Sequence, residues 1–198
     1  MKKKLLSILL MAMVTSTIFV GCGEKPVEKI TNTQIEVQEE VKEDVDDNEK
    51  ILSMVEKVEC SQEFVLEDMT MKLPETWEKV QDDIFTIDEL GLANFNVLTE
   101  ECGNINLNTY MTLSMKNLLS EYSLEKEDVV DIKTEHNGIK TRTIEYEFEV
   151  SEGLNAKIRQ VCVVHNKLAY IFTVGEIGGF SQETIDGFES AMNTMEFN

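Results

Sequence analysis

The sequence predicts an α+β fold, a single α/β/α sandwich around a central antiparallel sheet. Polar and apolar residues alternate from Ile139 to Val150, which is the period of a strand with one packed and one solvated face. The dipeptides Asn137-Gly138 and Asn166-Lys167 have the chemistry of hairpin turns and separate long strands of this kind. Two segments with helical spacing of apolar residues, one before and one after these strands, supply the covering layers.

The globular domain is predicted to occupy residues 61–198, which is the length of one ordinary domain. It begins with a strand pair around the turn Glu67-Asp68, and Pro74 ends the ladder of that pair. Trp77 follows shortly afterwards, where it can fold back over the sheet. The predicted strands are 64–66, 70–73, 83–87, 93–98, 129–135, 139–150, 155–165 and 168–175.

Two helices are expected. The first covers about 109–122, and the last begins with Ser181 as N-cap and has Glu183 in its first turn, where a negative charge favours the helix dipole. Methionine at such spacing is typical of a core and not of a ligand site. The inner faces are predicted to consist of Met111, Met115, Leu118, Leu119 and Tyr122 in the first helix and Ile185, Phe188, Met192 and Met195 in the last.

The amino end has the pattern of an export signal. Three lysines precede an apolar run from Leu5 to Val20, which is short for a membrane-spanning helix. The stretch Phe19-Val20-Gly21-Cys22 that follows resembles the lipobox of bacterial lipoproteins. Residues 1–21 are therefore predicted to be a lipoprotein signal peptide, and Cys22 is predicted to carry acyl chains that anchor the protein to the extracytoplasmic side of the cell membrane. The alternative is a cysteine that happens to end a signal anchor.

Residues 22–60 are predicted to form an acidic, disordered tether after the lipidated cysteine. The segment 23–59 contains no aromatic residue and is rich in acids and lysines, so it cannot bury enough apolar surface to fold. The whole chain has 38 acidic and 18 basic residues, a formal net charge of −20. Nucleic acid is therefore not an expected partner, because it binds positive patches.

Three cysteines remain after the predicted anchor. Their odd number, without a CxxC or Cys/His spacing, argues against a disulfide framework and against a zinc site. Cys162 lies within an apolar run and is predicted to be a core residue. The sequence leaves open whether Cys60 and Cys102 pair outside the cell.

A charged face is predicted on two neighbouring strands. Tyr146 and Phe148 are expected to share the packed side with Ala156 and Ile158, which places Glu147 and Glu149 beside Lys157 and Arg159 of the next strand. Such cross-strand ion pairs usually decorate a surface and contribute about 0.2–1 kcal/mol each. As a functional hypothesis, this face is where a partner docks. It consists of Glu145, Glu147, Glu149, Lys157 and Arg159.

The order of these elements resembles a known family. A strand pair that closes on Pro74-Glu75-Thr76-Trp77, a mid-chain helix, a long-stranded antiparallel meander and a terminal helix are similar to the PsbP-like fold. That group includes the photosystem subunit PsbP, the Ran-binding Mog proteins and DcrB- or LpqN-type exported bacterial proteins. The resemblance covers nearly all of residues 62–198 and implies a binding or assembly protein. No family site residue carries over, and Asp68 stands where the first turn often has Gly.

No catalytic motif is predicted. Ser123-Leu124-Glu125-Lys126 spells SxxK, but its companion elements are missing, and the glycine-rich stretch 175–179 lacks the spacing of a phosphate loop. His136 and His165 have no ligand spacing around them, and Asp82-Asp83 is expected to be solvated. Neither an enzyme activity nor a metal or other cofactor is therefore expected.

Two functions remain from the sequence. The favoured one is a membrane-anchored extracytoplasmic lipoprotein that acts as a non-catalytic protein-binding or assembly module, with a cell-envelope protein as its partner. The alternative is a small-ligand or metal-binding lipoprotein, whose site would be a cleft between sheet and helix.

Overall fold

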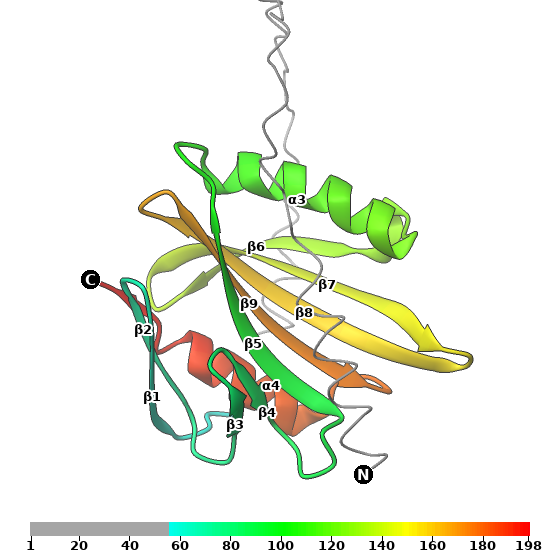
Figure 1. The fold of residues 1–198 in the computed structure, drawn as a ribbon, viewed down its shortest axis with the longest axis horizontal. Coiled ribbons are helices and arrows are strands. Elements are labelled where there is room, and N and C mark those ends of the chain that lie inside the picture. The colour runs from blue at the N-terminus through cyan, green and yellow to red at the C-terminus, as the bar shows by residue number, and fades with distance from the viewer. Residues whose placement is uncertain (1–55) are drawn as a thin grey trace, which may run out of the picture.

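The computed structural model describes residues 56–198 and confirms the predicted α+β class (Figure 1). A seven-stranded antiparallel sheet is covered by one helix on each face, and a small three-stranded sheet packs beside one of the helices. The strands of the large sheet, in spatial order, are β3 (Glu78–Gln81), β4 (Ile84–Thr86), β5 (Ala93–Glu101), β9 (Leu168–Ile177), β8 (Leu154–His165), β7 (Ile139–Ser151) and β6 (Val130–His136). The small sheet consists of β1 (Cys60–Leu66), β2 (Met69–Pro74) and β10 (Glu196–Phe197), and the helices are α3 (Leu107–Tyr122), α4 (Gln182–Met192) and the short 3₁₀ turn η1 (Lys126–Asp128).

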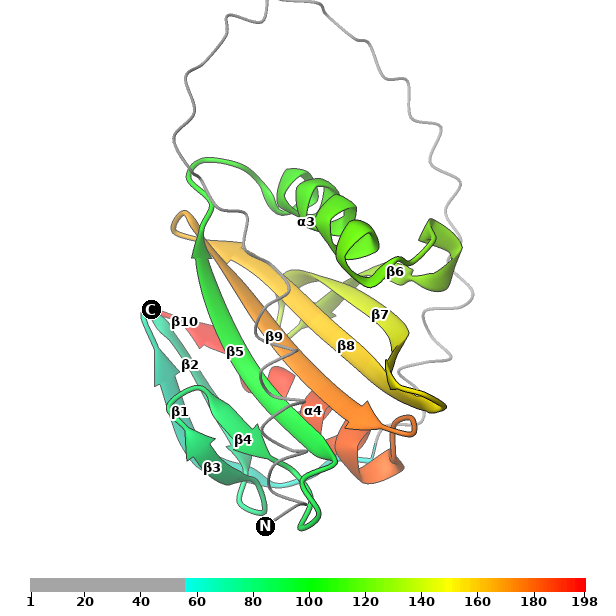
Figure 2. The same cartoon turned by 45° about the vertical axis from the view of Figure 1, so that its right-hand side comes forward.

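The two faces of the large sheet carry separate cores, which we name the α3 side and the α4 side (Figure 2). On the α4 side, the ring centres of Trp77 and Phe95 lie 5.1 Å apart in a tilted arrangement, and that of Phe188 in α4 lies 6.1 Å from the Phe95 ring centre. On the α3 side, Met111 and Leu118 of α3 belong to the same buried cluster as residues of β7, β8 and β9. Because β8 and β9 are covered on both faces, each is buried over six or more consecutive residues, and β9 is a nearly continuous apolar run.

Local chemistry explains how the elements begin and end. Asn137 and Gly138 both have positive φ, 49° and 76°, as a two-residue type I′ hairpin requires. The side chain of Asn106 accepts a hydrogen bond from Thr109 N at 2.9 Å, so α3 begins slightly before its predicted start. Ser181 Oγ accepts from Thr184 N at 3.2 Å, which confirms the predicted N-cap of α4.

Asp68 ties the turn between β1 and β2 to the turn between β8 and β9. Its carboxylate accepts hydrogen bonds from the Tyr170 hydroxyl and, at 2.6 Å, from Asn166 Nδ2. The hydrogen bond from Tyr170 is the main reason why the pKa of Asp68 lies below its ordinary value. An acid at this turn therefore makes contacts that a glycine could not make, and the preceding Glu67 takes the positive φ of 54°.

The structure departs from the sequence prediction in several elements. Strands β3 and β10 were not predicted, because all four residues of β3 are exposed and β10 has only two residues. Ile185 was predicted to face the core but is only half-buried, whereas Thr184, Gly187 and Ala191 are buried. Helix α4 is thus rotated about its axis relative to the prediction, and Gly187 lies against Trp77. A Cβ added to Gly187 would lie 3.1 Å from Cζ2 of the indole.

None of the helices within residues 56–198 is long and apolar enough to cross a membrane.

Candidate functional site

The five residues predicted as a partner face share the α4 side of β7 and β8. The strand register places Glu145 opposite Arg159 and Glu147 opposite Lys157. Glu149 lies opposite Asn155, so the prediction that Glu149 lies beside a basic residue of the next strand is wrong. Tyr146 and Phe148 lie opposite Ile158 and Ala156, as predicted.

Arg159 is at the centre of this face, and its guanidinium is bonded to two carboxylates. Its Nε and Nη2 donate to Glu145 Oε2 at 3.0 and 2.8 Å, and its Nη1 donates to Glu189 Oε1 at 2.8 Å. Only about 10% of the arginine side chain and 6% of the Glu189 side chain are exposed. Lys157 Nζ lies 2.5 Å from the other oxygen of Glu145. The guanidinium therefore joins a strand carboxylate to a helix carboxylate inside the fold.

His136 extends this arrangement across the sheet. Its Nε2 lies 3.1 Å from Glu189 Oε2, and its Nδ1 lies 3.0 Å from Thr141 Oγ1. Thr134 Oγ1 continues the chain, at 2.7 Å from Thr141 and 2.6 Å from Thr143. We name Glu145, Lys157, Arg159, Glu189 and His136 the ion-pair network. Each of its members reaches a partner on another strand or helix, so the network connects β6, β7, β8 and α4.

The network keeps its two carboxylates ionised. Burial alone would raise the pKa of Glu189, but the hydrogen bond from His136 and the nearby charges outweigh it, and the pKa is lowered. Burial would also raise the pKa of Glu145, and hydrogen bonds from Lys157 and Arg159 again outweigh it, so this pKa is lowered too.

These lowered pKa values predict that the domain loses stability in acid. Each carboxylate contributes stability that is fully present above the unfolded pKa of about 4.3 and is lost as the pH falls through the lower folded pKa. Urea unfolding between pH 7 and pH 3 should therefore show a falling free energy of unfolding. Glu189→Gln removes one of the two groups, so its stability should depend less steeply on pH. Equal slopes for both proteins would contradict this assignment.

A small cavity of about 60 Å³ lies against the network. It is lined by Val130, Ile132, Thr134 and Thr143 together with His136, Glu145, Arg159 and Glu189. A water molecule takes about 30 Å³ in the liquid, so this cavity has room for about two waters and not for a metabolite. Phe180 covers the network from the loop before α4, with its ring centre 5.5 Å from Lys157 Nζ and 5.8 Å from the Arg159 guanidinium carbon.

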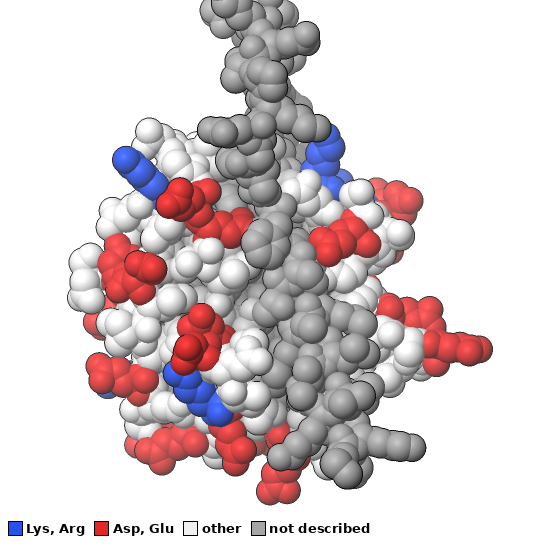
Figure 3. Space-filling model, in the orientation of Figure 1, with Lys and Arg blue, Asp and Glu red and all other residues white. Residues whose placement is uncertain are grey.

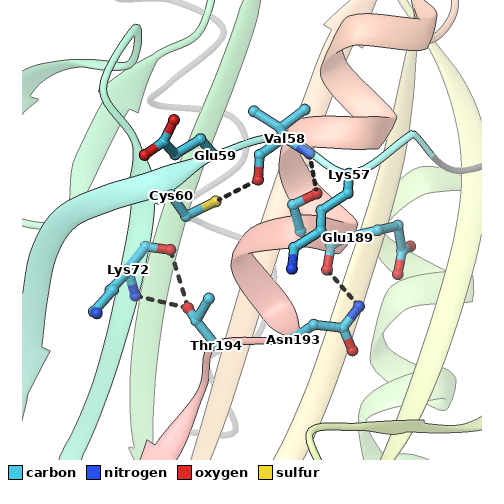
Figure 4. Close-up of a pocket in the computed structure, with 9 residues that line it drawn as sticks. Lys57, Val58, Glu59, Cys60, Lys72, Glu189, Asn193 and Thr194 are labelled. Atoms are coloured by element: carbon cyan, nitrogen blue, oxygen red, sulfur yellow. Dashed lines mark hydrogen bonds between the residues drawn. The ribbon is translucent and has the colours of Figure 1, made fainter.

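A larger groove of about 740 Å³ lies between the start of the fold, β2 and the end of α4 (Figure 4). We name it the α4 groove. Its lining is Lys57, Val58, Glu59, Cys60, Lys72, Glu189, Ser190, Asn193 and Thr194. Glu189 thus borders both this groove and the small cavity.

The segment that leads into β1 is held along this groove by α4. Glu56 N donates to Asp186 Oδ1 at 3.0 Å, and Val58 N donates to Ser190 Oγ at 2.9 Å. On the other wall, Thr194 Oγ1 bonds both the N–H and the carbonyl of Lys72, at 2.7 and 3.1 Å. The Cys60 thiol points toward α4, while the Lys72 ammonium points away from it (Figure 4). The groove thus offers hydroxyl, amide and thiol groups, and burial raises the pKa of that thiol.

The described cysteines are all free thiols. Cys60 packs against the core of the α4 side and Cys102 against the core of the α3 side, so the sheet separates them. The pairing that the sequence left open is absent from this structure. Cys162 is buried as predicted, and burial raises its pKa to about 12.

The other chemical motifs fall in structural positions. Ser123 of the SxxK stretch is the C-cap of α3 with φ of 55°, and its Lys126 begins η1. Glu176 of the glycine-rich stretch accepts hydrogen bonds from Ser181 and so helps to start α4. Within residues 56–198 there is no group of three or more His, Cys, Asp or Glu side chains placed to hold a metal ion.

Two network residues were missed by sequence reasoning. The sequence assigns His136 no ligand role, and Glu189 is not among the candidate residues that it predicts. The available signal was an acid directly after Phe188 on the packed side of the last helix, because a carboxylate is seldom buried without a partner. That signal could have indicated a buried ion pair, though not which residues complete it.

No protein-family model matches the chain, and no curated protein matches it in sequence. A crystal structure of a protein from Bacteroides thetaiotaomicron VPI-5482 aligns with a TM-score of 0.51 and 12% identity, over 69% of this chain and 48% of that one. The chain thus spans about half the length of the Bacteroides protein. The solution structure of cyanobacterial PsbP (CyanoP) from Synechocystis sp. PCC 6803 aligns with a TM-score of 0.47 and 12% identity, over 66% of this chain and 87% of that one.

A third structure is a protein of unknown function and putative regulator, PA94, from Pseudomonas aeruginosa. It aligns with a TM-score of 0.37 and 17% identity, over 58% of this chain and 81% of that one. At 12% identity the likeness to the Bacteroides protein shows the fold alone. The chain is therefore an α/β/α sandwich around an antiparallel sheet, and a PsbP protein is among the solved structures that align with it.

Proposed function

We propose that this chain is a lipoprotein, anchored through Cys22 to the extracytoplasmic side of the cell membrane, whose domain is a non-catalytic protein-binding or assembly module. Its partner is a cell-envelope protein that carries a basic surface. Support for the anchor comes from the sequence of the first 22 residues. The first strand of the described residues begins at Cys60, so the acidic segment between the two cysteines can serve as the tether.

The observation that carries the binding role is the rigid acidic end of the β7–β8 hairpin. Glu147 and Glu149 are exposed, and each is held in place by a local hydrogen bond. Asn155 Nδ2 donates to Glu147 at 2.6 Å, and Gly153 N donates to Glu149 at 2.7 Å. Acidic side chains gather at the tip of this hairpin, at the right of the view in Figure 3. Fixed charges of one sign steer and orient a partner of opposite charge.

The ion-pair network supports a structural and not a catalytic role for the basic residues of this face. The Nε, Nη1 and Nη2 atoms of Arg159 all donate to carboxylates. The two carboxylate oxygens of Glu189 are bonded to Arg159 and His136. These contacts hold the hairpin against α4, so that the exposed acids project from a rigid base. The docking surface is thus the acidic rim, with Arg159 as its internal support.

Site-specific photo-cross-linking in cells tests this proposal. A photoreactive residue at position 147 of the full chain should capture one recurrent envelope protein. The matched position is 121, where another exposed glutamate, in α3, lies on the other side of the sheet. A photoreactive residue at position 121 should not capture this protein. Capture from position 147 should be lost in the unanchored Cys22→Ala chain and should be weakened by Glu149→Lys. If positions 147 and 121 give the same set of proteins, the acidic rim is not a docking surface.

The α4 groove favours a second candidate, a small-ligand or metal-binding lipoprotein. Its volume of about 740 Å³ falls within the range of about 300–1,000 Å³ that small-molecule sites occupy. Thermal unfolding with divalent metal ions and common metabolites separates the candidates, because a ligand that binds the native state raises the melting temperature. A rise that Asn193→Ala abolishes would favour the ligand function over the assembly function.

A further inference from the structure

Strand β6 is a free edge of the seven-stranded sheet. Within the part of the chain that the structure describes, it pairs with β7 on one side only. It is seven residues long, and Val130 at its start has 49% of its surface exposed. An edge of this length presents unpaired backbone groups that another strand can use.

The turn that follows β6 determines which backbone groups face outward. In a two-residue hairpin the residues that flank the turn, here His136 and Ile139, form a hydrogen-bonded pair. Hydrogen-bonded and non-hydrogen-bonded pairs alternate along an antiparallel ladder. Asp131, Lys133 and Glu135 therefore belong to the pairs without hydrogen bonds to β7, and their N–H and C=O groups point away from the sheet.

The side chains of the same three residues set the charge pattern of the edge. Arg142 of β7 neutralises Asp131, with Nε and Nη2 at 3.0 and 2.5 Å from its two oxygens. Lys133 and Glu135 are exposed and form no ion pair with any described residue. The edge thus carries one positive and one negative side chain, two residues apart, and Glu135 lies opposite Lys140 of β7 without an ion pair to it.

We propose that a second copy of this chain docks on this edge, so that two β6 strands pair antiparallel about an axis at Thr134. In that register Lys133 of each copy lies opposite Glu135 of the other, which gives two matched charge pairs and joins their outward N–H and C=O groups. A register centred on Lys133 would place two lysines opposite each other, and like charges directly opposite are unfavourable. A lysine in the middle of an edge usually prevents pairing. Here the glutamate two residues away supplies its complement.

This interface is small, and it rests on the proposed membrane anchor. A pairing of seven residues buries less surface than the roughly 1,200 Å² of a stable complex. Confinement by two lipid anchors raises the effective concentration of each copy near the other. The proposed tether between Cys22 and Cys60 is long enough for each domain to turn its edge toward its neighbour. The dimer is therefore expected on the membrane and weak in dilute solution.

Cysteine cross-linking in the anchored full chain tests the register. Thr134 lies on the axis, so Thr134→Cys places two thiols opposite each other in a pair without hydrogen bonds, where Cα atoms are about 4.5 Å apart. The matched control is Ile132→Cys on the same face, which lies opposite His136 of the other copy and too far from its own equivalent. Under a mild oxidant, Thr134→Cys should give a disulfide-linked dimer. Ile132→Cys and the unaltered chain should not.

Charge reversal provides a second test, in which all the chains that are compared carry the same Thr134→Cys substitution. On the Thr134→Cys chain, Lys133→Glu or Glu135→Lys alone should lower the cross-linked fraction about tenfold, because each creates two like-charge pairs. Co-expression of the two variants should restore cross-linking between them, since every opposed pair is then of opposite sign. Equal cross-linking in all combinations, or none with Thr134→Cys, would overturn the proposal.

Failure of this inference can be told apart from failure of the proposed function. If Thr134→Cys gives no dimer while position 147 still captures an envelope protein, only the self-pairing is wrong. If Thr134→Cys cross-links equally well in the Cys22→Ala chain, the interface stands and its dependence on the anchor is wrong. If a different protein, and not a second copy, is linked through position 134, the edge binds another partner.

Discussion

Replacing Arg159 with alanine is expected to lower the free energy of unfolding by about 3–5 kcal/mol, which is typical when one partner of a buried ion pair is removed. The guanidinium is about 10% exposed and is bonded to both Glu145 and Glu189. Without it, the Glu189 carboxylate stays buried with His136 as its only other bonded partner in the network. The loss is measured by urea unfolding at pH 7 with intrinsic fluorescence or circular dichroism.

Lys157→Ala is the matched control for Arg159→Ala. Lys157 also pairs with Glu145 and also lies near Phe180, but about 35% of its side chain is exposed. Such a pair contributes about 0.2–1 kcal/mol, so the control should lose far less stability. Equal losses in the free energy of unfolding for the two variants would show that the burial of Arg159 does not determine how much it contributes to stability. Substitution of the charged residues together by apolar residues of similar volume should be much less damaging than Arg159→Ala.

Replacing Trp77 with alanine is expected to cost about 3–5 kcal/mol, the usual range for a buried aromatic residue changed to alanine. Trp77 is 3% exposed and packs between Phe95 of the large sheet and Gly187 of α4. Its removal leaves a cavity where the sheet, the small sheet and the helix meet. The measurement is again urea unfolding, with circular dichroism as the signal because the single tryptophan is lost.

Val80→Ala is the control for the tryptophan, because Val80 lies on the neighbouring strand β3 with 48% of its surface exposed. A substitution at such a position usually changes stability by no more than about 0.5 kcal/mol. Trp77→Phe should retain part of the packing and lose less than Trp77→Ala. A loss below about 1 kcal/mol for Trp77→Ala would mean that the neighbouring side chains close the cavity, which the close fit at Gly187 argues against.

The turns and caps were predictable because their chemistry is local. Asn137-Gly138 closes a hairpin through positive φ at both residues, and Ser181 caps α4 through its own hydroxyl. The helix register was less predictable. Ile185 was predicted to be inward, but contact with Trp77 turned Gly187 toward the core instead. A helix can rotate by a fraction of a turn and keep its apolar periodicity, so the close contacts with the sheet decide which residues are buried.

In the charged face too, some features were predictable from the local sequence and others depended on tertiary contacts. Alternation along β7 was enough to place Glu145, Glu147 and Glu149 on one side of the strand. The alternation could not reveal that Arg159 is buried and bonded to two carboxylates, because the second carboxylate belongs to Glu189 of α4. The three glutamates look alike in the sequence, yet Glu145 belongs to the internal network while Glu147 and Glu149 form the exposed rim.

The sequence by itself determined the fold class, the two long hairpins and the start of the last helix, since period, turn residues and caps act over a few neighbouring residues. Only the tertiary structure decided the ion-pair network and the free edge at β6. His136 and Glu189 are 53 residues apart, and Arg159 and Glu189 are 30 residues apart. The strand order leaves β6 outermost, which its sequence alone does not specify. Contacts between residues so distant along the chain depend on the packing of the whole domain, and local sequence patterns do not encode which of them will meet.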